Sequence, residues 1–212
     1  CYHPSWGRHR ARTFPTPGNH DYHVPGAPGY FTYFGANAGS LGGYYSFDLD
    51  EWHIVAYNSV IDISEGSPQL EWLRADLQAS PTKCILAYGY LPRFSSGWHG
   101  DEPKMGPMWS IFYEFGVDVV LSGHDHHYER FAPLDPDRTI DRDNGVSQFI
   151  VGTGGRRLRP IETVTSGREF RLTDDLGNRG VIAIDLQPDG FSWEFITIER
   201  GDVKDSGFER CR

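Results

Sequence analysis

The sequence has few cysteines, few methionines and no excess of positive charge. Its 212 residues carry 20 lysines and arginines against 29 aspartates and glutamates, which gives a net charge of −9. Proteins that bind nucleic acids through the phosphate backbone are usually basic, so we expect no nucleic-acid partner. No stretch of about 18 apolar residues is present, so we expect no membrane-spanning segment and no membrane partner.

The three cysteines, Cys1, Cys84 and Cys211, are too far apart for a zinc-finger or C-x-x-C spacing. Either they are free or buried thiols, or two of them form one disulfide. Methionine occurs only at Met105 and Met108, and the chain begins at Cys1 without a signal-peptide pattern. From this beginning we expect a chain that is processed, trimmed or a fragment.

Apolar residues make up 38% of the sequence and aromatic residues 14%, which is enough to build a core. The length suits a single domain spanning residues 1–212. Residues 1–43 are rich in glycine, proline and aromatic side chains, so we expect a loop with short ordered pieces there. Strands interleaved with helices predict a mixed α/β domain. The expected strands are 44–49, 53–57, 84–88, 117–121, 148–151, 181–186 and 191–198, and the expected helices are 68–79 and the region 108–115.

Local signals support several of these elements. Ser67 followed by Pro68 is typical of a helix start, because serine caps helices and proline suits the first turn. Pro188-Asp189-Gly190 predicts the turn of a hairpin between the last two expected strands. Val117–Leu121 is entirely apolar apart from one aspartate, as expected for a strand that is buried on both faces.

The first candidate site motif is Gly18-Asn19-His20-Asp21, in an expected loop. Asn19 offers a neutral amide oxygen to a metal ion, and His20 beside it can point at the same centre as a proton donor. A plain turn is the alternative, because so short a motif occurs easily by chance.

The second motif is Gly123-His124-Asp125-His126-His127, directly after the buried strand. Histidines two positions apart beyond a strand end can converge on one pair of metal ions if the loop is tight, and Gly123 permits the bend. Neutral imidazoles suit zinc, iron, manganese and related ions. The alternative is a solvated loop that happens to be rich in histidine.

Together these motifs resemble the later metal-binding signatures of the calcineurin-like metallophosphoesterases, in particular purple acid phosphatases and a bacterial secreted branch. The resemblance covers essentially the whole chain and indicates the family rather than the substrate. Further similar segments are Trp6-Gly7-Arg8, Gly29-Tyr30-Phe31, Tyr33-Phe34-Gly35, Gly43-Tyr44-Tyr45-Ser46, Pro92-Arg93-Phe94-Ser95-Ser96-Gly97, Tyr128-Glu129-Arg130-Phe131 and Val151-Gly152-Thr153-Gly154-Gly155.

The resemblance implies a β-sandwich of two mixed sheets flanked by helices, N-terminally incomplete here. It also implies metal-dependent hydrolysis of phosphate esters. Two divalent or trivalent metal ions would hold the phosphate and activate a water molecule. By carry-over, Asn19 and His124 bind the second metal, His126 binds the first, and His20 protonates the leaving alkoxide. Imidazole suits that last role because histidine ordinarily titrates near neutrality.

Two departures from the family pattern bear on activity. The family's first two motifs, Asp-x-(Gly/His/Asp) and Gly-Asp-x-x-(Tyr/Asn), do not occur in residues 1–17, so we expect that segment to be absent. Two residues before Pro92 the family has a metal-binding histidine, and here that position is Tyr90. Tyr90 is a doubtful ligand, because an unbound phenol has a pKa near ~10. We therefore expect impaired hydrolysis, and the alternative is a catalytically silent relative that binds a ligand or partner through the same cleft.

Further residues have expected roles in substrate binding or in structure. His99 is a candidate for lining the cleft mouth and binding substrate, whereas Arg93 and Arg130 suit either a phosphate or a structural salt bridge. Secreted members of the family look similar around Cys84 and Cys211, so the resemblance predicts a disulfide between them and a secreted or periplasmic location. Cys1 would then be unpaired.

Overall fold

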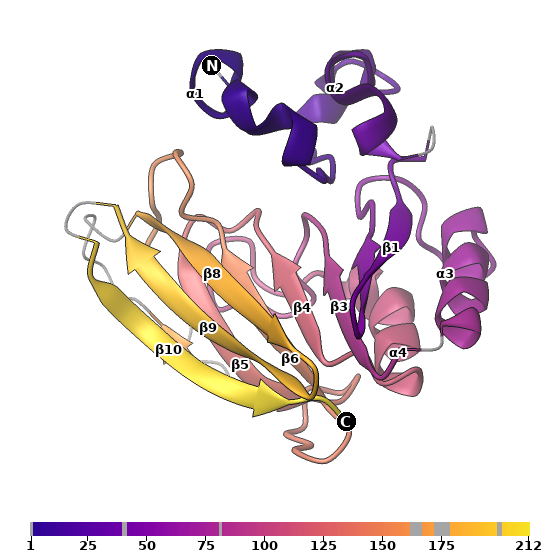
Figure 1. Ribbon diagram of the computed structural model, residues 1–212, viewed down its shortest axis with the longest axis vertical. Coiled ribbons are helices and arrows are strands. Elements are labelled where there is room, and N and C mark those ends of the chain that lie inside the picture. The colour runs from indigo at the N-terminus through magenta and orange to yellow at the C-terminus, as the bar shows by residue number, and fades with distance from the viewer. Residues whose placement is uncertain (1, 40–41, 81, 162–166, 172–178, 199–200) are drawn as a thin grey trace.

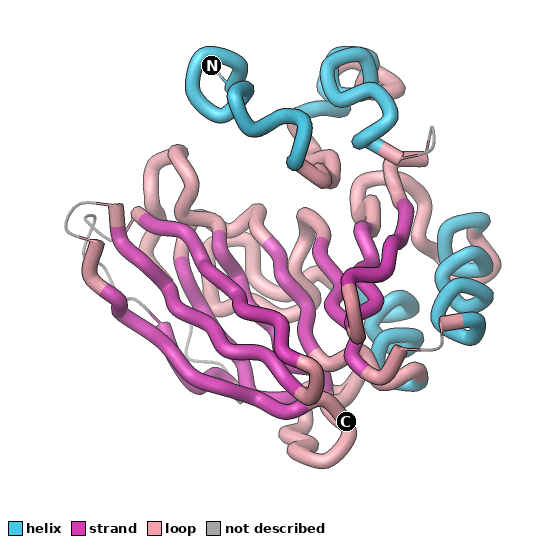
Figure 2. Tube along the Cα trace, in the orientation of Figure 1, coloured by secondary structure: helices cyan, strands magenta, loops and turns pink. Residues whose placement is uncertain are grey.

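The computed structural model describes residues 2–39, 42–80, 82–161, 167–171, 179–198 and 201–212. Cys1 lies outside these ranges. A seven-stranded sheet forms the centre, helices α3 and α4 cover one face, and a three-stranded sheet covers the other (Figures 1 and 2). The mixed α/β sandwich flanked by helices is thus confirmed. In the described residues the second sheet is antiparallel rather than mixed.

The large sheet has the strand order β1-β2-β3-β4-β6-β5-β7. Strands β2, β3, β4 and β6 run parallel, and the outer strands pair antiparallel. The loops that follow β3, β4 and β6 therefore emerge at one edge, where sites form in α/β proteins. The strands are β1 Tyr45–Leu49, β2 Trp52–Ala56, β3 Cys84–Tyr88, β4 Val119–Ser122, β5 Tyr128–Leu134, β6 Val146–Val151 and β7 Arg168–Arg171.

Two helices, α3 Pro68–Ala79 and α4 Gly106–Glu114, pack on one face of this sheet. In α3 the buried residues Leu70, Leu73 and Leu77 recur at helical spacing, so a single stripe meets the sheet. Ser67 takes the N-cap position, but its side chain makes no capping hydrogen bond. Apolar packing therefore holds this helix more than its cap does.

The second sheet has the order β10-β9-β8, from β8 Gly180–Gln187, β9 Gly190–Thr197 and β10 Val203–Arg210. Strands β8 and β9 form the predicted hairpin. Phe191, Trp193 and Phe195 alternate along β9 and are buried against the large sheet, in a cluster that includes Tyr128 and Phe149. This aromatic layer joins the two sheets.

A disulfide joins Cys84 to Cys211, with their Cα atoms 5.3 Å apart. It links the first residue of β3 to the residue after β10. The predicted pairing is therefore confirmed, and it ties the two sheets together covalently.

The N-terminal segment lies over the edge towards which β3 and β4 point (Figure 1). It is more ordered than the expected loop. It contains α1 Tyr2–Ser5, α2 Pro28–Phe34 and 3₁₀ turns at Trp6–Arg12, Asp21–His23 and Gly35–Ala38, and one further 3₁₀ turn, Pro103–Met105, precedes α4. Among the described residues, no helix has the length and apolar character needed to cross a bilayer.

Candidate functional site

The histidine-rich loop after β4 is tightly bent. The amide of Asp125 donates to the carbonyl of Gly123 at 2.7 Å, the amide of His127 donates to the carbonyl of Asp125 at 2.9 Å, and His124 has a φ of 62°. Asp125 and His127 are almost fully buried, whereas His124 and His126 are half-buried. Burial therefore alternates along the loop: the side chains of Asp125 and His127 are inside the fold, and those of His124 and His126 lie nearer the surface.

His124 lies in a cluster of aromatic rings. Its Nδ1 is 3.1 Å from the Tyr90 hydroxyl, and its ring centroid is 4.1 Å from that of His99. Burial, with the nearby His99, lowers the pKa of His124 to about 4. At neutral pH this imidazole is therefore uncharged and has a nitrogen lone pair to offer a metal ion.

The ring of His126 is oriented by the backbone. Its Nδ1 donates to the carbonyl oxygen of Arg157 at 2.9 Å, which places the proton on Nδ1 and leaves the lone pair on Nε2. Burial lowers the pKa of His126; the hydrogen bond to Arg157 opposes this shift, and the charge of Arg159 adds to it. This histidine too is held in the neutral form that metals bind.

The Asn19 loop reaches this cluster through Tyr90. The Asn19 amide oxygen is buried without a hydrogen-bond partner, which is costly for a polar atom unless something else coordinates it. Gly18 lies against Tyr90, since a Cβ added there would be 2.9 Å from the ring carbon Cε2. Tyr90 therefore bridges the Asn19 loop and His124.

His20 is placed less closely. Its side chain is exposed, and its ring centroid lies 4.6 Å from that of His23. Within the described residues, none of the contacts made by its ring reaches His124.

A buried hydrogen-bond network supports the loop that carries His99. The amide of His99 donates to Asp125 Oδ1 at 3.2 Å, and the hydroxyl of Ser95 bonds the other oxygen of that carboxylate. Glu129 accepts from the amide of Ser96 at 2.9 Å and contacts His127 Nε2 at 3.1 Å. Asp125 and His127 thus support the 95–99 loop, and Glu129 is a supporting residue that the sequence analysis missed.

The weaker candidates have other partners. Arg130 pairs with Asp205 at 2.8 Å and also with Glu169, so its role is a structural salt bridge. The guanidinium of Arg93 lies 4.7 Å from the centroid of the Phe94 ring. Arg130 therefore forms a structural salt bridge, and Arg93 packs against an aromatic ring.

The donors present match a metal site in type but not in number. Among the described residues, no group of three or more histidine, cysteine, aspartate or glutamate side chains is placed to hold a metal ion. Tyr90 adds little, because burial, with the charges of Asp21 and Asp125, raises the pKa of its phenol and disfavours the phenolate. Asn19, His124 and His126 fit part of a two-metal centre, and the part of the chain that the structure describes does not supply a whole one.

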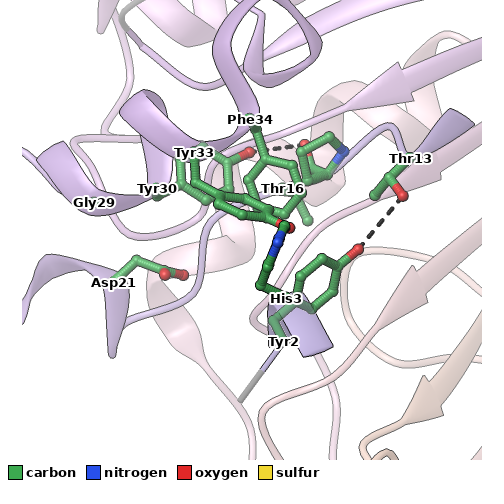
Figure 3. Close-up of a pocket in the computed structure, with 10 residues that line it drawn as sticks. Tyr2, His3, Thr13, Thr16, Asp21, Gly29, Tyr30, Tyr33 and Phe34 are labelled. Carbon is green, nitrogen blue, oxygen red and sulfur yellow. Dashed lines mark hydrogen bonds between the residues drawn. The ribbon is translucent and has the colours of Figure 1, made fainter. Parts of the chain in front are cut away.

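A cavity of about 500 Å³ adjoins the Asn19 loop (Figure 3). Most of its phenol hydroxyls are already bonded: Tyr30 donates to the carbonyl of Pro15 at 2.9 Å, and Tyr33 bonds His3 Nδ1 at 2.9 Å. The cavity therefore offers mainly aromatic faces. It is lined by Tyr2, His3, Thr13, Pro15, Thr16, Asp21, Gly29, Tyr30, Tyr33 and Phe34.

Comparison with known proteins identifies the family. The model of the calcineurin-like phosphoesterases matches residues 3–128, which is more than half of the chain. The chain belongs to this family. Within this calcineurin-like phosphoesterase, the matched stretch contains the Asn19 loop, Tyr90 and the His124 loop.

Named relatives agree with the family. The chain is 31% identical to Purple acid phosphatase 21 of Arabidopsis thaliana over 180 residues, which are 80% of this chain and 40% of that protein. It is 29% identical to Acid phosphatase type 7 of Homo sapiens over 183 residues, 74% of this chain and 40% of that protein. A solved purple acid phosphatase from yellow lupin (Lupinus luteus) seeds shares the fold, with a TM-score of 0.70 and 19% identity, over 80% of this chain and 33% of that one. The chain thus spans less than half of the length of these relatives.

Proposed function

We propose that the protein hydrolyses phosphate esters at a centre of two metal ions, such as zinc, iron or manganese. Its family membership and the purple acid phosphatase relatives support this activity. The observation that carries the proposal is the pair of imidazoles of His124 and His126 in the loop after β4, together with the unpartnered Asn19 oxygen in a loop that contacts Tyr90 beside His124. Bound there, the ions would supply charge neutralisation and an activated water molecule.

The proposed roles follow the family pattern. Asn19 and His124 hold one ion, His126 holds the other, and His20 gives its proton to the leaving alkoxide. His99, beside His124, contacts the substrate. Residues 1–212 act as one domain, which the cystine between its two sheets supports. An oxidising, extracytoplasmic location is proposed on the same ground, since disulfides persist in such compartments.

Tyr90 favours a second candidate function. Its phenol stands where the family has a metal-binding histidine, and it occupies Nδ1 of His124. A silent relative that binds a ligand through the same edge of the sheet would tolerate this substitution. We therefore expect the 212-residue chain itself to turn over phosphate esters slowly or not at all.

The test is hydrolysis of p-nitrophenyl phosphate with added zinc, iron or manganese, measured together with metal content. Robust metal-dependent turnover by the unmodified chain would show that it holds enough metal ligands without the family's first two motifs. The decisive variant is a longer chain that supplies the family's first two motifs ahead of residue 1, with and without Tyr90→His. Partial activity in the longer chain and more with Tyr90→His supports the hydrolase. If both longer chains bind two metals and remain inactive, the ligand-binding alternative holds.

A further inference from the structure

The loop after β6 is tied to one of the candidate metal ligands. His126 donates from Nδ1 to the carbonyl oxygen of Arg157 at 2.9 Å, and the amide of Arg159 donates to the carbonyl oxygen of His126 at 3.0 Å. This reciprocal pair fixes the backbone of residues 157–159 against His126. The arginines of this loop are therefore held at the same edge of the sheet as the site.

The side chain of Arg159 is also oriented. Its Nη1 donates to His99 Nε2 at 2.9 Å, and its guanidinium carbon lies 5.6 Å from the centroid of the Trp98 ring. Because a guanidinium can only donate, His99 accepts at Nε2 and carries its own proton on Nδ1. The ring of His99 in turn lies 4.1 Å from that of His124, so a single histidine ring separates the guanidinium from His124.

No carboxylate among the described residues neutralises the charge of this loop. Arginines elsewhere pair with carboxylates, as in Arg74–Glu114 and Arg138–Asp101. Within the described residues, Arg156, Arg157 and Arg159 have no carboxylate partner. Three such cations in four positions are notable in a chain of net charge −9. Unpaired guanidinium groups retain the forked donors that match phosphate oxygens.

We propose that Arg156, Arg157 and Arg159 bind anionic substrate groups beside the candidate metal ligands. Arg159, held by His99 and Trp98, binds the phosphoryl group. Arg156 and Arg157, which are exposed, bind a second phosphate of the same substrate. The proposal rests on the proposed function and narrows its substrates to esters that carry more than one phosphate.

The experiment uses the metal-free 212-residue chain, so that binding is measured without turnover. Orthophosphate and pyrophosphate are titrated calorimetrically at constant ionic strength. We expect pyrophosphate to bind about tenfold more tightly, because two further charge-assisted contacts form. Arg159→Ala is expected to weaken both anions about tenfold, and Arg159→Lys less, since lysine keeps the charge without the fork. The double variant Arg156→Ala with Arg157→Ala should abolish the preference for pyrophosphate.

The matched control is Arg142→Ala, which removes an exposed arginine that is paired with Glu169. It should leave both affinities unchanged. A separate measurement follows the histidine ring resonances by NMR. Pyrophosphate is expected to shift the resonances of His99 in the wild type and not in Arg159→Ala. The proposal is overturned if the wild type binds neither anion, if Arg159→Ala binds as the wild type does, or if Arg142→Ala loses as much. If anion binding is intact but the longer chain with Tyr90→His still fails to turn over phosphate esters, that result would instead count against the proposed function.

Discussion

Replacing Tyr90 by histidine tests the ligand count most directly. The exchange removes the phenol that bonds His124 Nδ1 and puts an imidazole between His124 and the loop of Asn19. Zinc sites with four protein ligands bind with ~10–16 kcal/mol, or ~3 kcal/mol for each ligand. Immobilising the new imidazole and the His124 ring on the ion costs roughly 1 kcal/mol. The net gain of ~2 kcal/mol corresponds to zinc binding that is about 10- to 100-fold tighter.

The assay is competition for zinc between the metal-free chain and a chromophoric chelator at neutral pH. Tyr44→His is the control, because it adds an imidazole directly before β1, beside Trp72 of α3, rather than at the site. The gain should also vanish when His124→Ala is combined with Tyr90→His. An affinity within about threefold of the wild type, or a gain that persists without His124, would refute the reasoning.

Three further predictions concern stability and loop geometry. Replacing Cys84 and Cys211 by alanine opens a loop with a sequence separation of 127 and should lower the free energy of unfolding by about 2–5 kcal/mol, seen as a lower urea midpoint; an unchanged midpoint contradicts this. The hydrogen bond with Asp76 is the main cause that raises the pKa of His53 above 6.5. The stability that protonated His53 contributes is therefore fully present below pH 6.5 and is lost as the pH rises through the folded-state pKa. The fall in urea midpoint between about pH 6 and about pH 9 should therefore shrink in His53→Gln, and an equal fall in both proteins would disprove the assignment. Gly18→Ala should weaken zinc binding about tenfold, because the new methyl meets a tyrosine ring carbon at 2.9 Å and displaces the loop; unchanged affinity would show that the loop adapts.

Much of the fold follows from local sequence signals. The apolar runs correctly predicted β2, β3 and β4, and the leucine spacing after Pro68 correctly predicted α3. A strand buried on both faces appears in the sequence as an apolar run, and a helix buried along one stripe appears as apolar residues at helical spacing. Strands β5, β7 and β10 were not predicted. Their charged residues suggest a solvated loop, yet Arg130 on β5 meets Asp205 on β10 across the two sheets. A pairing over 75 positions has no local signature.

The candidate site was likewise predicted only where a sequence motif marks it. The resemblance singled out Asn19, His124 and His126 by their motifs. It did not indicate Arg159, whose side-chain partners Trp98 and His99 lie on another loop, about 60 positions away in the sequence. Such contacts depend on which strand ends are neighbours in the sheet, and that order follows from the whole fold rather than from any one segment.

The cystine between Cys84 and Cys211 makes the chain topologically a ring with a free arm. The ring contains Tyr90, the histidine loop after β4 and Arg159, whereas Asn19 lies on the arm. A single proteolytic cut inside the ring leaves both pieces joined until the disulfide is reduced. A cut before Cys84 can release the arm and carry away the Asn19 donor alone. Limited proteolysis followed by electrophoresis with and without reductant therefore distinguishes a cut inside the ring from a cut in the arm that carries Asn19.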